Sequence, residues 1–569
     1  MTRGGLLIGL ISSIFAGVVG DTSDLETFAL AVEFTPEGFK RKDEVISACF
    51  SYLELIKKEG VPQYVLDEVQ QLSEVFFKYR EAEDAGKVIK LAGNMQRYPE
   101  PKDWIAGPAL IRDLKMEAVN ALLAKLKPQD ASLALTSKEF AKLADKREKW
   151  YGTQYAELPV DRRGWKTQEL ASFSLPKPNP FIPQDFTLKY ARAPANPDGP
   201  APPAVISESD TWRVFAKPDT TYGQPKGYAY MLINQPDTVL GSQTTPRTSA
   251  LTKLYRAYLD DALTEFTYDA AVAGLEYSCD FTQRGVSLSF AGFNDKLPAY
   301  IESVSQSIAS FLPDDEAKLN KFKDLISRDL ASFPFEQPYQ HAGRFSQLIT
   351  MAPGYLPTDV LKEMDSITLA DLQQFTKGLW SKAFGQALIQ GNFKQEEALQ
   401  IAKSVEKAFN LQPLPEDQRG APKLAVLPVV KQGYGSVLQR PEPNPVDTNS
   451  AAVVQSQNAD RDNLKQQMAM EVLAIIMGNP FFADLRTKQQ LGYIVYGGVS
   501  NKEGVRSLVF TAQSSVADAD VLTEKIFNFM EAFSLKDISD KQVSPSGKMG
   551  EEEDMHTCVT ESLEGTPQR

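Results

Sequence analysis

Residues 479–498 read NPFFADLRTKQQLGYIVYGG, and this stretch decides the fold of the segment around it. Apolar side chains recur at helical spacing across residues 468–490, which predicts a helix. Gly492 stands where the end of a helix favours a left-handed glycine. Tyr493, Val495 and Gly497 then alternate with Ile494 and Tyr496, as in a strand. The sequence therefore predicts a helix–glycine–strand corner that brings the guanidinium of Arg486 close to the phenol of Tyr493.

Two interpretations of this corner follow from the residue types. Most arginines and tyrosines are structural, so Arg486 can pair with a carboxylate while Tyr493 caps a core. Alternatively, Arg486 presents a fixed, always-charged fork of donors, and Tyr493 presents a phenol, to one point in space where a ligand is held. The local pattern leaves both interpretations open.

Five motifs along the chain carry a resemblance to a known family. They are RTKQQLGYIV in the stretch above, KWYGTQY at 149–155, NPFIPQDF at 179–186, the segment 268–296 and EQPYQH at 336–341. In order and spacing they resemble the insulin-degrading enzyme and pitrilysin family, also called insulinases, which are zinc peptidases with an inverted H-x-x-E-H motif. The resemblance covers about residues 5–535.

The resemblance implies roles for particular residues. Arg486 and Tyr493 match the pair that reaches across a closed chamber to the zinc site and holds the substrate backbone. Phe482, one turn before Arg486, matches an aromatic residue of the substrate pocket. The family also holds a peptide N-terminus on a strand edge by strand addition, and here that edge falls near Phe15 and Gly17.

Zinc is the cofactor that the resemblance implies, yet the sequence predicts no zinc ligands in this chain. It has two histidines, His341 and His556, and neither heads an H-x-x-E-H motif. We expect His341 to be structural, as a lone histidine usually is. His556 and Cys558 lie in an acidic tail, where two donors do not complete a metal site. The chain therefore resembles the non-catalytic middle and C-terminal portion of such a peptidase.

The expected fold class is α+β, with successive insulinase-type domains that each pack an antiparallel-rich sheet against helices. Residues 1–165 are predicted to form part of a second domain, followed by a Pro-rich linker at 166–197. A third domain is expected at 198–423 and part of a fourth at 424–537. The polar, acidic residues 538–569 have no aromatic side chain and are predicted to be a disordered tail.

The composition limits which kinds of partner and which cellular compartment fit this chain. The net charge of −13 argues against nucleic acid and against an anionic membrane as partners. Three scattered cysteines suit a reducing compartment, so we expect the cytoplasm, with a secreted or organellar location left open. Residues 6–19, LLIGLISSIFAGVV, resemble a signal peptide but are too short to span a bilayer, and we favour an internal core element.

The function expected from these features is that of the substrate-enclosing, zinc-free part of a metalloendopeptidase that acts on peptides. We expect this chain to be inactive alone and to need a catalytic half that carries H-x-x-E-H. The alternative is a non-catalytic peptide-binding or assembly subunit of the same fold. Whether the chain is itself an enzyme, and whether it forms a homo-oligomer, stay open.

Overall fold

The computed structural model describes residues 9–533, with gaps at 20–21, 23–24, 82–86, 161–164, 166–172, 194–200, 422, 425–434, 436 and 459–462. The predicted tail at 538–569, with His556 and Cys558, lies outside the described residues. So do part of the expected linker and most of residues 424–430, where the sequence also predicts a strand. The antiparallel-rich sheets packed with helices confirm the predicted α+β class.

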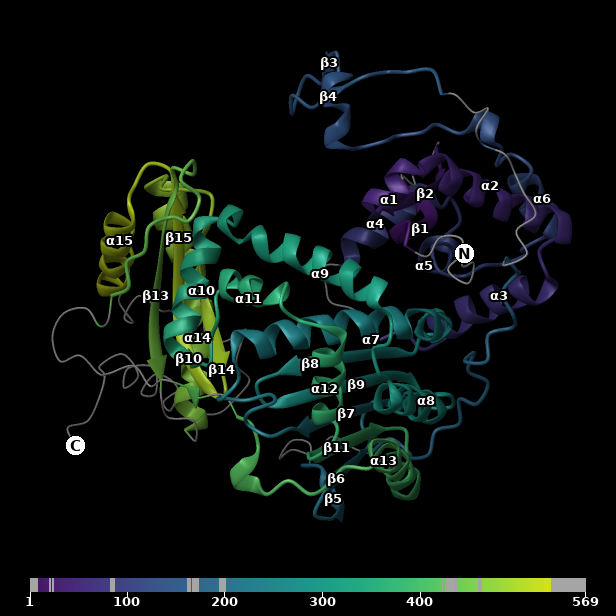
Figure 1. Cartoon of the computed structure of the whole chain (residues 1–569). Coiled ribbons are helices and arrows are strands. Elements are labelled where there is room, and N and C mark those ends of the chain that lie inside the picture. Colours follow the sequence, from purple (N-terminus) through teal and green to yellow (C-terminus); the bar gives the residue numbers. More distant parts are fainter. Residues whose placement is uncertain are drawn as a thin grey trace.

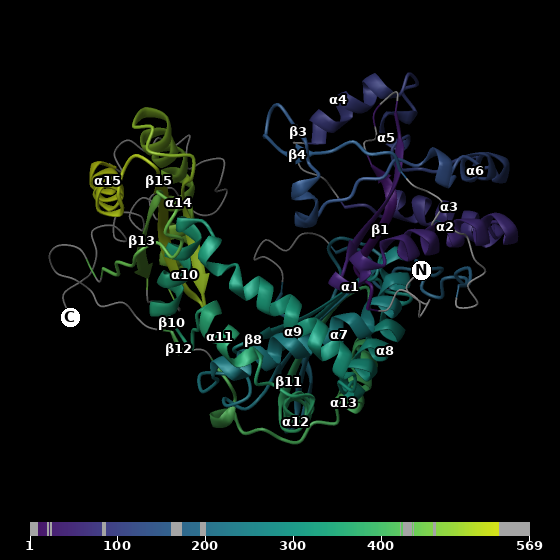
Figure 2. The same ribbon diagram turned by 45° about the horizontal axis from the view of Figure 1, so that its top comes forward.

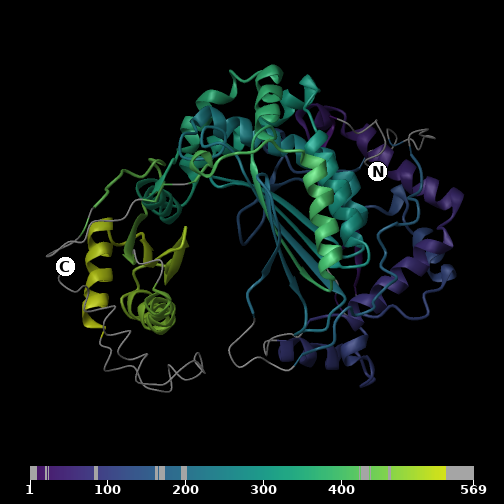
Figure 3. The same ribbon diagram turned by 90° about the horizontal axis from the view of Figure 1, so that it is seen from below.

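Three units follow one another along the chain (Figures 1 and 2). An N-terminal unit, drawn in purple and blue, and a C-terminal unit, drawn in yellow-green, lie on opposite sides of a teal central unit. Figure 3 shows the same order from below, with the yellow C-terminal unit far from the purple N-terminal unit. The predicted domain boundaries stay predictions.

The N-terminal unit is built from a hairpin and a set of helices. Strands β1 (Ile11–Val19) and β2 (Thr27–Phe34) pair antiparallel, and a smaller hairpin follows much later in the chain. The sequence also predicts a helix near 107–113, and this prediction is wrong, because the short α5 ends at Ala106, before Gly107 and Pro108. The remaining elements are α1 (Pro36–Lys40), α2 (Lys42–Glu59), α3 (Gln63–Lys78), α4 (Lys87–Arg97), α5 (Asp103–Ala106), α6 (Met116–Leu123), β3 (Lys146–Arg147) and β4 (Gln154–Tyr155).

The central unit contains a six-stranded sheet in the order β5-β6-β11-β7-β9-β8, antiparallel except for the β6–β11 pair. Alternate residues such as Met231 and Leu288 are buried on the helix-covered face, whereas Tyr230 on the other face is 46% exposed. The strands are β5 (Ala204–Glu208), β6 (Trp212–Pro218), β7 (Lys226–Asn234), β8 (Glu276–Thr282), β9 (Gly285–Phe293) and β11 (Phe384–Gly391).

Seven helices of the central unit accompany this sheet within the described residues. The longest, α7, begins at a capping box in which the Thr245 hydroxyl accepts from the Thr248 amide, with Pro246 in the first turn. The sequence did not predict α11, which is short and opens at Pro357. The helices are α7 (Pro246–Val272), α8 (Leu297–Ser310), α9 (Glu316–Ala331), α10 (Pro338–Thr350), α11 (Pro357–Met364), α12 (Leu369–Leu379) and α13 (Gln395–Phe409).

The C-terminal unit is a three-stranded antiparallel sheet in the order β13-β15-β14. Helix α14 packs on one face with α15, and α10 of the central unit lies against the other face. A second small pairing joins β10 (Met351–Ala352) to β12 (Lys423–Leu424). The elements are β13 (Ser450–Asn458), α14 (Leu464–Phe482), a π-helix (Ala483–Lys488), β14 (Val495–Lys502), β15 (Val505–Ser514) and α15 (Ala519–Ala532).

The segment Leu464–Lys488 is the one described helix that is long and apolar enough to cross a membrane, judged by length and composition. Its side chains Leu473, Met477 and Phe481 are buried against the sheet in the core of the C-terminal unit. A core helix meets the same criterion, so this feature is weak evidence for a membrane span.

Side-chain contacts hold the central and C-terminal units together. Arg284, in the β8–β9 turn, forms an ion pair with Glu503, in the β14–β15 turn. The Gln513 side chain accepts a hydrogen bond from the Tyr339 amide at 3.0 Å and donates to the Gln337 side chain at 3.1 Å. These contacts fix the sheet that carries the candidate site against α10.

Candidate functional site

The corner between α14 and β14 forms as predicted, but Gly492 is not the left-handed residue that ends the helix. The left-handed residue is Gln490, with φ of 54°, so the expected left-handed stop at Gly492 is wrong. Gly492 is needed for a close approach instead, because a Cβ there would lie 1.9 Å from the carbonyl oxygen of Gln513. The Gln513 amide donates to the Ile494 carbonyl at 2.9 Å, which holds β15 against this corner.

A turn of π-helix at Ala483–Lys488 sets the direction of the Arg486 side chain. Single π-helical turns are rare and are frequent at functional sites. Buried Leu485 anchors this turn in the core, and the Leu491 amide donates to the Leu485 carbonyl at 3.1 Å. The corner is therefore a fixed piece of backbone that rests on packed apolar side chains.

Arg486 lies between two aromatic rings. Its guanidinium carbon is 4.6 Å from the centre of the Phe482 ring and 4.1 Å from the centre of the Tyr493 ring. The structure thus brings the three residues predicted from the motif into direct contact. Contact with two rings restricts the position of the guanidinium, whose N–H donors can still reach a ligand.

The structural alternative for this corner does not hold among the described residues. No described carboxylate lies within ion-pair distance of Arg486, and the nearby Asp484 carboxylate instead accepts from the Gln489 side chain at 2.9 Å. Tyr493 caps no core, because its side chain is 76% exposed. Phe482 is 39% exposed, whereas its neighbour Phe481 is fully buried. Phe482 and Tyr493 are thus exposed, and Arg486 lies half-buried against them.

Phe15 and Gly17 lie in β1, within the N-terminal unit and away from Arg486 (Figure 1). They pair with Ala31 and Ala29 of β2, and β1 has no second neighbour among the described strands. Its other edge therefore presents unpaired backbone donors and acceptors. Phe15 is 52% exposed, and its ring covers Gly17, where a Cβ would lie 2.8 Å from the ring.

His341 is buried on α10, with its ring in edge contact with Phe333 at 4.8 Å between ring centres. Its Nε2 atom lies 3.4 Å from a carboxylate oxygen of Glu442. Within the described range, no group of three or more His, Cys, Asp or Glu side chains could hold a metal ion. The residues described here do not fit the zinc that the family resemblance implies.

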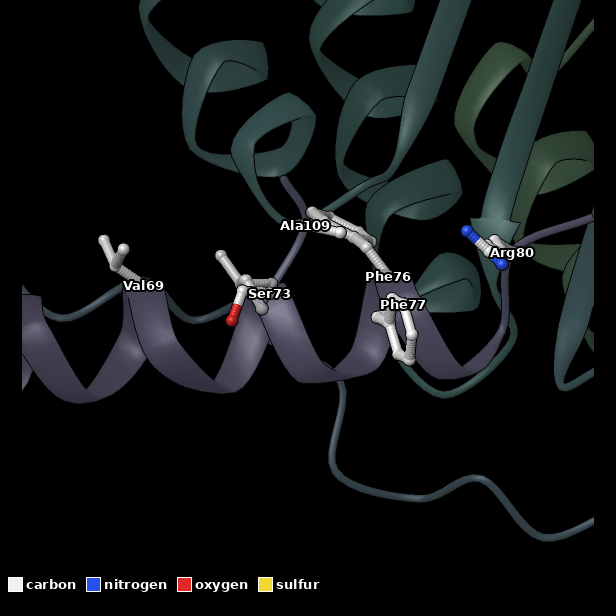
Figure 4. Close-up of a pocket in the computed structure, with 7 residues that line it drawn as sticks. Val69, Ser73, Phe76, Phe77, Arg80 and Ala109 are labelled. Atoms are coloured by element: carbon white, nitrogen blue, oxygen red, sulfur yellow. The ribbon is translucent and has the colours of Figure 1, made fainter. Parts of the chain in front are cut away.

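Cavities also lie elsewhere in the described part of the molecule. One, of about 500 Å³, runs along α3 and is lined by Val69, Ser73, Phe76, Phe77, Arg80 and Ala109 (Figure 4). Another, of about 400 Å³, lies between α10 and the C-terminal sheet. The sequence did not predict either cavity. A signal for the second was present in the runs of polar residues that end both strands, at 455–458 in β13 and 500–502 in β14.

Comparisons with known proteins agree with this fold. Residues 77–363 match the family described as the middle or third domain of peptidase M16. Residues 366–544 match the family described as the peptidase M16 inactive domain. The chain belongs to the peptidase M16 family, which confirms the resemblance seen in the sequence motifs.

Three curated relatives illustrate the similarity. The chain is 29% identical over 540 residues to insulin-degrading enzyme-like 1, peroxisomal, of Arabidopsis thaliana, covering 93% of this chain and 54% of that protein. It is 29% identical over 515 residues to insulin-degrading enzyme of Homo sapiens, covering 89% and 49%. It is 29% identical over 556 residues to nardilysin of Rattus norvegicus, covering 94% and 46%. The chain spans about half the length of these relatives.

Among solved structures, the crystal structure of pitrilysin matches the whole of this chain and 58% of its own chain, with a TM-score of 0.64. The two are 20% identical, so this likeness shows the fold alone.

Proposed function

We propose that this chain is the substrate-enclosing, zinc-free portion of an insulinase-type metalloendopeptidase, and that it holds peptides while another domain cuts them. The observation that carries the proposal is the contact of half-buried Arg486 with the exposed rings of Phe482 and Tyr493, without a carboxylate partner among the described residues. A cation that is stacked on rings but not neutralised is suited to a ligand that brings its own acceptor.

A peptide carbonyl is the acceptor that fits this arrangement. Arg486 can donate to it through the planar fork of N–H groups on its guanidinium. Tyr493 donates a hydrogen bond from its phenolic O–H to the oxyanion that develops on a scissile carbonyl. Removing one such donor typically raises the barrier by ~2.7–4 kcal/mol. Zinc, supplied by a domain that carries H-x-x-E-H, would activate the attacking water.

The open edge of β1 supplies a second contact for the same peptide. The unpaired edge near Phe15 and Gly17 can accept an extended peptide N-terminus as an added strand. Main-chain hydrogen bonds of this kind do not depend on side chains, so this contact can hold peptides of many different sequences. Substrate selection then falls to the enclosed space and to groups near Arg486. We place the chain in the cytoplasm, although one relative carries the description peroxisomal.

The test is reconstitution. The purified chain is mixed with the zinc-bearing half of a relative such as insulin-degrading enzyme, and hydrolysis of a fluorogenic peptide is followed. We expect activity on mixing and its loss with Arg486→Ala. Lys488→Ala, two residues further along the same turn, is the matched control and keeps the activity. Mixtures that bind peptide but never cleave it would contradict this role.

A non-catalytic peptide-binding or assembly subunit is the second candidate function. The match of residues 366–544 to a domain described as inactive favours it. For such a subunit, we expect the same peptide affinity with and without the zinc-bearing half, and no hydrolysis of the peptide. Sedimentation of the chain alone would show whether it assembles as a homo-oligomer.

A further inference from the structure

The sheet of the C-terminal unit has two faces of different character. Leu508, Phe510 and Ala512 of β15 point into the core beneath α14, so the residues between them face α10. On β14, Tyr496, Ser500 and Lys502 share the α10 side, because Tyr496 pairs with Thr511 and Ser500 with Ser507. The cavity of about 400 Å³ lies on this side.

The walls of this groove are set by hydrogen bonds between its own residues. The Ser346 hydroxyl of α10 donates to the Gln455 side-chain carbonyl at 2.8 Å, and the Gln455 amide donates to the Ser507 hydroxyl at 2.8 Å. Tyr339 and Tyr496 meet edge to face at 6.5 Å between ring centres. These residues are engaged with one another, and the groove between them has a defined shape.

Lys502 is the cation that lines this groove, and it is partly buried. No described carboxylate lies within ion-pair distance of it. Its neighbour Glu503 is engaged by Arg284, and Glu471 lies 3.5 Å from Arg506, which belongs to the opposite face of the sheet. Burial lowers the pKa of the Lys502 ammonium, as expected for a charge that has lost water without gaining a partner.

We propose that this groove binds a carboxylate of a peptide ligand, with Lys502 as its counter-ion and Ser500 as a neighbouring hydroxyl donor. A single ammonium beside neutral donors matches the charge of a monoanion such as a carboxylate. Phosphate is usually bound by several cations or by the guanidinium of arginine. The Tyr339–Tyr496 pair offers an apolar wall for the aliphatic part of an acidic side chain.

The peptide is the source of the carboxylate because β14 joins this groove to Arg486. Tyr493 stands just before β14, which ends at Lys502, and β14 is an edge strand of the described sheet. At ~3.3 Å per residue, the two points are at most roughly 30 Å apart. The inference rests on the proposed function, and adds that preferred peptides carry an acidic residue about eight or nine extended residues from the one held at Arg486.

The test measures how fast the Lys502 amine is acylated by an amine-reactive ester, with site-specific quantification by mass spectrometry. The probes are an extended peptide of about ten residues with one glutamate near its end, its glutamine twin, and inorganic phosphate. Lys40, whose side chain is 74% exposed in the N-terminal unit, serves as the internal control in the same sample. We expect the glutamate peptide to slow labelling of Lys502 roughly tenfold at saturation, and the twin and phosphate to leave it unchanged.

The inference would be overturned if the glutamate and glutamine peptides protected Lys502 from acylation equally, or if neither did. Stronger protection of Lys502 by phosphate would also overturn it. Lys502→Gln provides a second measurement, because it should reduce affinity for the glutamate peptide to that of the twin, roughly tenfold lower. Arg486→Ala separates the two proposals. If Arg486→Ala leaves peptide affinity unchanged while Lys502 is still protected, the proposed role of Arg486 fails and the carboxylate site at Lys502 stands without it. If Arg486→Ala weakens both twins equally and Lys502 is unprotected, this inference alone fails.

Discussion

The guanidinium carbon of Arg486 lies 4.1 Å from the centre of the Tyr493 ring, and Phe482 packs near it at 4.6 Å. Each cation–π contact at an exposed site is worth ~0.5–1 kcal/mol, which is enough to favour one orientation of the side chain. The donors at the edge of the guanidinium are therefore positioned before a ligand arrives, and less entropy is lost on binding.

Arg486→Ala should weaken binding of an unmodified peptide by roughly tenfold or more, because a hydrogen bond to a charged donor contributes ~1.5–3 kcal/mol. Arg486→Lys should restore little of this affinity, since an ammonium lacks the planar fork that stacks between the rings. Fluorescence anisotropy with a labelled peptide measures both. Lys488→Ala, with a side chain that is 75% exposed, is the control, and an equal loss there would contradict a specific role.

Phe481 and Phe482 are neighbours in sequence, but Phe481 packs in the core whereas Phe482 contacts Arg486. Substitutions at these two residues therefore compare core packing with ligand binding. Phe481 is fully buried, with ring centres 4.9 Å from Phe510 and 5.2 Å from Phe529. Phe481→Ala should cost ~3–5 kcal/mol of unfolding free energy. Phe482→Ala should cost far less and should weaken peptide binding by freeing Arg486. Urea unfolding and anisotropy separate the two effects, and similar destabilisation by both changes would refute this division.

Gly492→Ala should destabilise the corner, because its Cβ would collide with the backbone oxygen of Gln513 at 1.9 Å. Backbone cannot yield as a flexible side chain does, so the expected cost is ~1–3 kcal/mol or more. Gly498→Ala is the control in the same unit, since nothing lies within 4 Å of a Cβ there. Thermal unfolding measures both, and an unchanged melting temperature for Gly492→Ala would contradict the close approach.

Burial raises the pKa of the Cys279 thiol to about 12, chiefly because a thiolate is poorly solvated in the core of the central unit. A thiol whose folded pKa is raised contributes stability that is fully present below its unfolded pKa of ~8.5 and is lost as pH rises toward the folded value. Unfolding free energy should therefore fall between about pH 8 and about pH 10, and Cys279→Ala should reduce that fall.

Urea titrations of both proteins at the two pH values provide the check. Buried tyrosines such as Tyr255, whose pKa is also raised by burial, contribute a fall of the same sign that remains in Cys279→Ala. An identical pH dependence in the two proteins would show that Cys279 is not the group responsible.

Much of the local structure followed from patterns of apolar residues. The periodic segment at 468–490, which contains α14, was predicted from spacing, and the contact between Arg486 and Tyr493 followed from the helix–strand corner. The part played by Gly492 could not be predicted, because it depends on where the Gln513 carbonyl lies, and Gln513 is distant in sequence. Helix α15 was missed although Asp518 caps its first turn by accepting from the Val521 amide.

The groove beside Lys502 could not be predicted for a related reason. It forms only where α10 of the central unit meets the sheet of the C-terminal unit, and contacts such as Ser346–Gln455 join residues far apart in the chain. Sequence spacing shows which side of a strand Lys502 occupies, but not what covers that side. The isolation of Arg486 from carboxylates likewise depends on tertiary neighbours, which is why two interpretations stayed open.

The central claim is that this chain holds peptides and does not cut them alone. The most direct measurement incubates the purified chain with a labelled peptide, with and without added zinc, and follows binding by anisotropy and cleavage by mass spectrometry in the same sample. The account predicts a bound, intact peptide under both conditions, and weaker binding for Arg486→Ala. Zinc-dependent cleavage by the chain alone, abolished by Arg486→Ala, would contradict it.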